Sequence, residues 1–234
     1  MLKMNSELYE KAIESQFMNG IDSVEETRRK LEYYFNGRYK KIFYIKGETI
    51  CREGELENNI FFLDRGKVIV VRKDANNNEY SGGYFMPGEF FGFASIVSEP
   101  EEMSFRSLNN CNVYVISSSA VMELMERNEE SRRFITNILV NTIRIRTSRQ
   151  GNLIMGGCRA AFVNFILEHM EGFGKVDDED NIVVSLDVNL IDIAQILNMT
   201  RETLSRIVSE MKRQGIIDTK RRYIKIIDME RFMA

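Results

Sequence analysis

The stretch that decides the fold is residues 189–214, NLIDIAQILNMTRETLSRIVSEMKRQ. Its polar residues stand where helix caps are needed: Asn189 can cap a first helix over Leu190–Leu197, and Thr200 can cap a second over Thr200–Arg213. Asn198 lies in the short turn between them, at a position that needs a positive φ. Asparagine is one of the few non-glycine residues that accept this conformation. The stretch therefore predicts two short helices joined by a tight turn.

The apolar residues of these two helices are spaced to pack on each other. Ile193 and Ala194 face inward from the first helix, and a small residue such as Ala194 lets two helices cross at a steep angle. Leu204 and Ile207 point back onto them from the second helix. A small residue, a turn residue and two apolar residues at this spacing are typical of a helix-turn-helix.

Four polar residues lie on the opposite face of the second helix, in its first turns: Arg201, Glu202, Ser205 and Arg206. The N-terminal residues of such a helix contact base edges in the major groove of double-stranded DNA. Arginine can donate two hydrogen bonds to guanine O6 and N7, and glutamate can accept one from cytosine N4. An exposed Arg-Glu pair is usually a solvated surface. Here the motif presents the pair within a basic region, and we predict DNA base contacts.

The region around this helix is basic, although the whole chain carries a net charge of −3. Residues 199–227 hold eight Lys or Arg against three acidic side chains. Lys220 to Arg222 fall in the turn before a predicted strand over Tyr223–Ile227, so this hairpin forms a basic wing suited to phosphate contacts. The predicted phosphate contacts are Asn189, Thr200, Thr203, Lys220, Arg221 and Arg222.

Residues 39–116 show a different pattern, that of short strands. Apolar or alternating runs at 60–63, 68–71 and 113–116 are separated by glycine-rich and asparagine-rich turns. Turn signals at a spacing of about 8–12 residues indicate an all-β sandwich or barrel. Two successive hairpins of this kind predict a jelly-roll-like β-roll.

A long helix is predicted after the β region. Ser117-Ser118-Ser119 can cap a short helix over Ala120–Arg127, and a second helix runs from Glu129 to about Gln150. One face of the second helix has a 4-3-4 seam typical of a two-stranded coiled coil. The alternative is a helix packed only on its own β region. We favour the dimer, because Ile135, Leu139 and Ile143 supply a second apolar stripe for the β region. The predicted dimer seam is Phe134, Ile138, Asn141 and Ile145, in which polar Asn141 fixes the register.

Glycines divide the chain beyond this helix. Gly151 and Gly156-Gly157 predict a flexible joint, followed by a helix over Arg159–Met170 and a strand over Ile182–Leu186. At the other end, a helix over Glu25–Phe35 is stopped by Asn36-Gly37. The predicted fold class is α+β. Its domains are residues 1–117 (a helical lead-in and a jelly-roll-like β-roll), 118–151 (a short helix and the long dimerisation helix with its hinge) and 152–234 (a winged helix-turn-helix).

The stretch IAQILNMTRETLSRIVSEMKRQGII resembles the DNA-binding helices of the Crp/Fnr family of bacterial transcription regulators. GETICREGELENNIFFLDRGKVIVV and PGEFFG resemble that family's cyclic-nucleotide-binding-type β-roll, and the long helix resembles its dimer helix. The resemblance covers about residues 39–227. It implies that Arg201, Glu202 and Arg206 read a TGTGA-like half-site, as in the catabolite-activator branch. Glu202, Ser205 and Arg206 also match the E-x-x-S-R pattern of the Fnr branch, which reads TTGAT. We expect a homodimer that reads a palindrome with a TGA-like core.

The ligand site departs from the family pattern. Phe93 follows Gly92 where cyclic-nucleotide binders carry the glutamate that holds the ribose, and Glu101 or Met103 stands where they carry the phosphate-binding arginine. Glu99, Glu101 and Glu102 would repel a phosphate. We therefore expect an unidentified effector at the β-roll, with cAMP-type control as the alternative. The candidate pocket is Phe85, Phe91, Gly92, Phe93, Met103 and Ser104, although β-roll core is the favoured interpretation of its aromatic residues.

Other sensors and an enzymatic role fit the sequence poorly. The three cysteines, Cys51, Cys111 and Cys158, are dispersed and read as small buried residues, with a thiol redox-responsive regulator as the alternative. The first 50 residues hold no cysteine for an iron–sulfur cluster. His169 is the only histidine, which disfavours a haem sensor and a cupin-type metalloenzyme. We expect no enzyme activity, no metal and no cofactor.

Composition bounds the remaining partners. Apolar residues make up 44% of the chain, as in an ordinary globular protein. No apolar run approaches the roughly 18 residues of a membrane span, and the N-terminus lacks the apolar segment of a signal peptide. We expect a cytoplasmic protein that does not bind membranes. Its predicted partners are double-stranded DNA, a second copy of itself and, if it is an activator, RNA polymerase.

Overall fold

A computed structural model of the chain describes Asn5, Glu7–Tyr9 and residues 22–74, 76, 79–186, 188–220 and 222–234. These residues form two compact units. The roll unit is Asp22–Arg146, and the C-terminal unit is Thr147–Ala234 together with Asn5 and Glu7–Tyr9. This division differs from the predicted domains, because most of 118–151 packs with the β-roll and the start of the lead-in belongs to the C-terminal unit.

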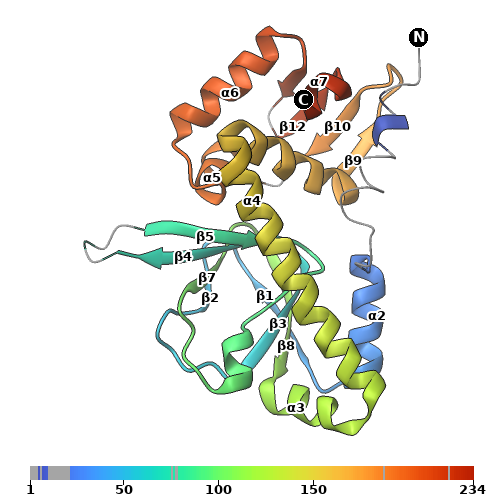
Figure 1. Ribbon diagram of the computed structural model, residues 1–234, viewed down its shortest axis with the longest axis vertical. Helices are drawn as coiled ribbons and strands as arrows, with labels where there is room; N and C mark the ends of the chain where they lie inside the picture. Colours follow the sequence, from blue (N-terminus) through green and yellow to red (C-terminus); the bar gives the residue numbers. More distant parts are fainter. Residues whose placement is uncertain are drawn as a thin grey trace. The chain divides into compact units, whose positions relative to one another are not determined.

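The roll unit contains two antiparallel four-stranded sheets (Figure 1). One has the strand order β1-β8-β3-β6, and the other β2-β7-β4-β5. The predicted β-roll is therefore confirmed. The strands are β1 (Lys40–Tyr44), β2 (Thr49–Cys51), β3 (Asn59–Arg65), β4 (Val68–Lys73), β5 (Glu79–Phe85), β6 (Phe90–Phe91), β7 (Ser104–Ser107) and β8 (Cys111–Ser117).

Strand β3 shows why the predicted apolar runs are continuous. Successive side chains of a strand point to opposite faces. Ile60 and Phe62 pack on the helices of the unit, whereas Phe61 and Leu63 pack on the second sheet. All four are buried, because both faces of this strand are covered.

Three helices and a short 3-10 helix complete the roll unit: α2 (Val24–Phe35), η1 (Phe93–Val97), α3 (Ser118–Arg127) and the first part of α4 (Glu129–Phe173). Asn36 ends α2 in the left-handed conformation, with φ of 43°, so the predicted stop is confirmed. The Ser117 hydroxyl caps α3 by accepting from the Ala120 backbone N–H. Tyr34 of α2 stacks on Phe134 of α4 with ring centroids 4.4 Å apart.

Two helices follow one another within α4 and meet at Gly157, which has the non-helical φ of 66° and ψ of −165°. The first helix runs past its predicted end near Gln150 and through Gly151, because one glycine in a helix costs only about 1 kcal/mol and does not by itself stop it. The second helix covers the predicted Arg159–Met170. Gly157 adopts a left-handed φ that a side chain would disfavour, which locates the joint at one of the three predicted glycines.

The faces of α4 also differ from the prediction. Phe134 and Ile135 are both buried in the roll unit, and Ile138 and Leu139 pack partly on the same cluster. Val140 and Ile143 are instead exposed, with 47% and 65% of their surface accessible, and further along α4 Ile154 and Met155 are exposed as well. Phe134 and Ile138 therefore pack within the chain, and the ring of Tyr34 from α2 stacks on Phe134. Asn141 and Ile145 are half-buried.

The C-terminal unit combines a four-stranded antiparallel sheet, of order β11-β12-β10-β9, with helices. The end of α4 contributes a buried face that includes Phe162, Phe165 and Ile166. No helix among the described residues is long and apolar enough to cross a membrane. The other elements are β9 (Gly174–Val176), β10 (Ile182–Ser185), α5 (Leu190–Ile196), α6 (Arg201–Arg213), β11 (Ile217–Lys220), β12 (Tyr223–Ile226) and α7 (Met229–Met233).

Candidate nucleic-acid interface

Helices α5 and α6 begin at the two predicted caps. The Asn189 side chain accepts from the backbone N–H groups of Ile191 and Asp192, each at 2.9 Å, and Asp192 accepts in return from the Asn189 N–H. The Thr200 hydroxyl accepts from the Thr203 N–H at 3.1 Å. Asn198 has φ of 52° in the turn between the helices. The predicted caps and turn are confirmed.

The packing of the two helices follows the prediction with one change. Ile193 and Ala194 of α5 are buried, as is Leu204 of α6. The second inward residue of α6 is Val208, whereas Ile207 is only half-buried. Leu204 and Val208 are four residues apart and so lie on one side of the helix. This arrangement orients α6 with its other side toward solvent.

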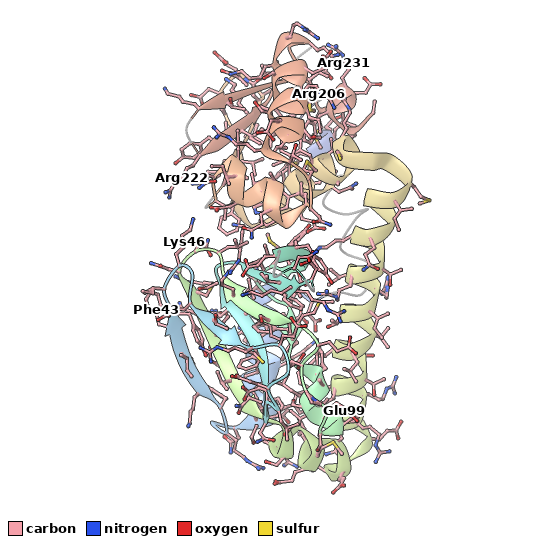
Figure 2. All side chains as sticks on the ribbon, turned by 90° about the vertical axis from the view of Figure 1, so that its left-hand side faces the viewer. Phe43, Lys46, Glu99, Arg206, Arg222 and Arg231 are labelled. Atoms are coloured by element: carbon pink, nitrogen blue, oxygen red, sulfur yellow. The ribbon has the colours of Figure 1, made fainter. Side chains whose placement is uncertain are left out.

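The exposed side of α6 carries the four predicted base-contacting residues. Arg201, Glu202, Ser205 and Arg206 are all exposed; Arg206 is labelled in Figure 2. Within the described part of the chain, none of these four side chains makes a hydrogen bond or an ion pair. Their donors and acceptors are therefore available to an external ligand, and two of them are arginines.

Three of the other six basic residues in this region are paired with acidic side chains. Lys212 contacts Asp218 at 3.0 Å, and Arg213 contacts Glu210. Lys225 contacts Asp177 at 2.8 Å and Glu179 at 2.9 Å, and the hydrogen bond from Lys225 holds the pKa of Asp177 well below its usual range. The positive charge that remains for a phosphate is therefore concentrated on fewer residues than the sequence count suggests.

The predicted wing is the hairpin of β11 and β12. Its strands pair in antiparallel register, with Lys220 opposite Tyr223. Lys220 and Arg222 are exposed at the turn, where Arg222 is labelled in Figure 2. The predicted contact Arg221 lies outside the described residues. Asn189, Thr200 and Thr203 are at the N-terminal ends of α5 and α6, where the backbone N–H groups and helix dipoles favour anions.

The candidate effector pocket is not one site. Phe85 and Phe91 stack with centroids 4.8 Å apart in the interior of the roll, and Met103 packs on the same cluster. Phe93 instead packs with the helices on the other side of the sheet. Gly92 lies between the two clusters, with φ of 84°. The Ser104 hydroxyl accepts from the Glu53 N–H at 3.0 Å. The aromatic residues thus form two parts of the core.

Glu101 is the unusual residue of this region. Its side chain is 7% exposed, and its backbone pairs with Gly54 and Glu55. One carboxylate oxygen is buried without a hydrogen-bond partner among the described residues. Burial raises the pKa of Glu101, and the nearby Glu57 and Glu102 raise it further, while a hydrogen bond from the Ala94 backbone lowers it.

Burial makes two of the three cysteines poor nucleophiles. Cys51 and Cys111 are buried. Burial raises the pKa of Cys51 to about 12 and that of Cys111 to about 11, so their nucleophilic thiolate forms are scarce near neutral pH. Cys158 is half-buried on α4. His169 is fully buried, and its Nδ1 lies 2.7 Å from the Phe165 carbonyl oxygen, so it packs in the core of the C-terminal unit.

Comparison with known families matches both halves of the chain. Residues 41–128 match the model of the cyclic nucleotide-binding domain. Residues 162–234 match the model of the Crp-like helix-turn-helix domain. The first match contains both sheets of the roll except Lys40, the first residue of β1. The second match contains α5, α6 and the wing.

Individual relatives are similar to this chain over most of its length and most of their own. The cAMP-activated global transcriptional regulator CRP of Salmonella typhimurium is 22% identical over 176 residues, which cover 74% of this chain and 83% of that protein. The cAMP-activated global transcriptional regulator Vfr of Pseudomonas aeruginosa is 23% identical, covering 76% and 84%. The solved structure of FixK2 from Bradyrhizobium japonicum has a TM-score of 0.69 at 20% identity, covering 83% and 95%, and so shares the fold.

Proposed function

The chain belongs to the Crp/Fnr family of transcription regulators, and from this premise we propose that it binds a palindromic DNA site as a homodimer, with one α6 helix in each half-site. The observation that carries the proposal is the exposed side of α6. There, Arg201, Glu202, Ser205 and Arg206 engage no other side chain of the described residues. On a surface with no ligand, arginines commonly form ion pairs, as Arg213 does with Glu210 on the same helix. Arg201 and Arg206 form none among the described residues.

The chemistry of these four side chains supports a half-site with a TGA-like core. Arg201 and Arg206 can each donate to guanine O6 and N7, and Glu202 can accept from cytosine N4 on the paired strand. Ser205 lies between them on the same side of α6 and can bond either a base or a phosphate. Lys220 and Arg222 are exposed and would bind phosphates of the DNA backbone, which would position the wing beside the duplex.

The exposed stripe of α4 supports a dimer. Val140 and Ile143 expose 47% and 65% of their surface, and Thr136 and Thr147 extend this stripe in a 4-3-4 spacing. That spacing is the seam of a two-stranded coiled coil. We propose this stripe as the dimer contact in place of Phe134 and Ile138, and expect two-fold related α6 helices about 34 Å apart for adjacent major grooves.

Control by something other than cAMP is the third part of the proposal. A cyclic phosphate needs a cation or N–H donors, and Glu101 is a buried acid in the loop before β7. The relatives CRP and Vfr are cAMP-activated by name, which makes cAMP the alternative effector here. An effector that acts on this chain would have to repack the aromatic interior of the roll or bind outside it.

The test is selection of DNA from a random pool with the full chain, followed by titration of the selected duplex. We expect an enriched palindrome, and a loss of about 1–3 kcal/mol in binding for Arg206→Ala. Arg213→Ala is the matched control, because it removes an arginine from the same helix that is paired to Glu210. Selection without enrichment, or equal losses for the two variants, would contradict the proposal. Added cAMP should leave affinity unchanged.

A further inference from the structure

Strand β5 contains a bulge at Gly82. Val70 of β4 pairs with Gly83, and the next residue, Val71, pairs with Ser81. Gly82 is therefore the extra residue on β5, and its peptide groups stand outside the regular ladder. A Cβ on Gly82 would lie 2.6 Å from the Sδ atom of Met103 and 3.1 Å from a methyl carbon of Val70, so the roll interior packs closely against the bulge.

Arg146 of α4 binds this bulge. Its Nη2 atom donates to the Gly82 carbonyl oxygen at 3.0 Å. Its guanidinium carbon also lies 4.9 Å from the centroid of the Phe85 ring, within the range of a cation–π contact. The planar guanidinium can make both contacts together, because it stacks with its face and donates with its edge.

Phe85 connects Arg146 to the interior of the roll. Its ring stacks on Phe91 at 4.8 Å and meets Phe105 edge-on at 5.8 Å. Phe91 in turn stacks on Phe61 at 5.1 Å. These four rings, which we call the aromatic cluster, join both sheets of the roll, since Phe61 lies on β3 and Phe105 on β7. A change in their packing must therefore shift the surface on which Arg146 rests.

Arg146 lies at the boundary between the two compact units. Arg146 is the last residue of the roll unit, and Thr147 begins the C-terminal unit along the same helix. The nearest departure from helical geometry beyond it is Gly157. Arg146 is thus the attachment of the roll to α4 that lies directly before the helix leaves the unit.

We propose that Arg146 is a positioning residue, through which the packing of the aromatic cluster sets the position of the end of α4 and thereby the affinity for DNA. The proposal rests on the proposed function for its last step. The signal need not be a ligand inside the roll. Any event that displaces Phe85 or the Gly82 carbonyl would change the two contacts of Arg146, and with them the position of α4.

The first experiment measures hydrogen exchange in the full chain, without DNA. The variants are Arg146→Gln, Phe85→Leu and the two combined. The matched control is Arg133→Gln, an exposed α4 position whose ion partner is Glu129. We expect Arg146→Gln to raise exchange about tenfold in the α4 segment 147–158 while the roll strands stay unchanged. The double variant should show no more than the larger single effect, because both changes break one connection.

The second experiment titrates the selected duplex with the same variants. We expect Arg146→Gln to weaken binding at least about threefold and Arg133→Gln to leave it unchanged. Unchanged exchange in segment 147–158, equal exchange increases in the roll strands, or wild-type DNA affinity despite altered exchange would each overturn the proposal. If the wild-type chain selects no duplex, the proposed function fails, and the exchange result alone decides whether Arg146 positions α4.

Discussion

The hydroxyl group of Tyr9 donates a hydrogen bond to the carbonyl oxygen of Met170, which is 3.1 Å away and 161 residues later in the chain. Gly174 makes room for this contact, because a Cβ there would lie 3.0 Å from the Tyr9 oxygen. Asn5 adds three contacts: its side-chain amide donates to the Asp180 and Ile227 carbonyls and accepts from the Met229 N–H, each at 3.0 Å. These N-terminal residues are part of the C-terminal unit.

The first prediction concerns this docking. Asn5→Ala should lower the free energy of unfolding of the C-terminal unit by about 1.5–4.5 kcal/mol, since three hydrogen bonds are lost and each contributes about 0.5–1.5 kcal/mol net. Exchange of the α7 amides in the full chain measures the effect. Glu7→Ala is the control, because Glu7 is exposed on the same segment. Equal protection of α7 in the two variants would mean that the segment contributes no stability.

The difference between the confirmed and the missed features is one of range along the chain. The caps Asn189 and Thr200 act on residues within three positions of themselves, so local sequence rules identify them. Asn5 acts on partners more than 170 residues away, and no local pattern encodes such a pair. Arg146 was missed for the same reason, because its carbonyl partner exists only where the β4–β5 pairing forms a bulge.

Sequence spacing also identified apolar stripes on α4 without determining which neighbour each one meets. Phe134 fits a dimer seam by spacing, yet the ring of Tyr34 covers it. Ile143 fits the inner stripe, yet 65% of its surface is exposed. The choice between faces depends on where α2 packs, and this is a tertiary contact. The base-contacting residues were easier to predict, because the caps and the inward residues of α6 fix its outward side.

The second prediction tests the exposed stripe of α4. Ile143→Glu should weaken self-association by at least about tenfold, because it places a charge in an apolar seam that must be desolvated on dimer formation. Sedimentation equilibrium at several concentrations measures the dissociation constant. Asn137→Glu adds the same charge at an exposed α4 position beside the stripe and should change the constant much less than Ile143→Glu does. A wild-type chain that stays monomeric at all concentrations would contradict the dimer.

The third prediction separates phosphate contacts from base contacts. Arg222→Ala should weaken binding to all duplexes by a similar factor and reduce the slope of log K against log salt by about 1, because one counterion-releasing contact is lost. Arg206→Ala should instead reduce discrimination between the selected site and a variant with one changed base pair. Titrations of both duplexes at four salt concentrations give the two quantities. A loss confined to the selected duplex in Arg222→Ala would assign Arg222 to base reading.

The last prediction concerns the buried acid Glu101. Burial raises its pKa in the folded state above the usual glutamate value, and Glu57 and Glu102 act in the same direction. The folded state therefore binds more protons than the unfolded state at pH values between the unfolded and folded pKa, and stability falls as pH rises through this window. Below the unfolded pKa both states are protonated and this contribution to the pH dependence vanishes.

Glu101→Gln removes the ionisation but keeps the shape of the side chain. Urea unfolding should find the variant more stable than the wild type by about 1 kcal/mol at pH 8, because the wild type then holds a buried carboxylate with one unpartnered oxygen. The difference should shrink as the pH falls toward 4. Glu99→Gln is the control, since Glu99 is an exposed acid in the same loop and is not one of the acids that raise the pKa of Glu101. A stability difference between Glu101→Gln and the wild type that is the same at pH 4 and pH 8 would show that the acid is not ionised at a cost in the folded roll.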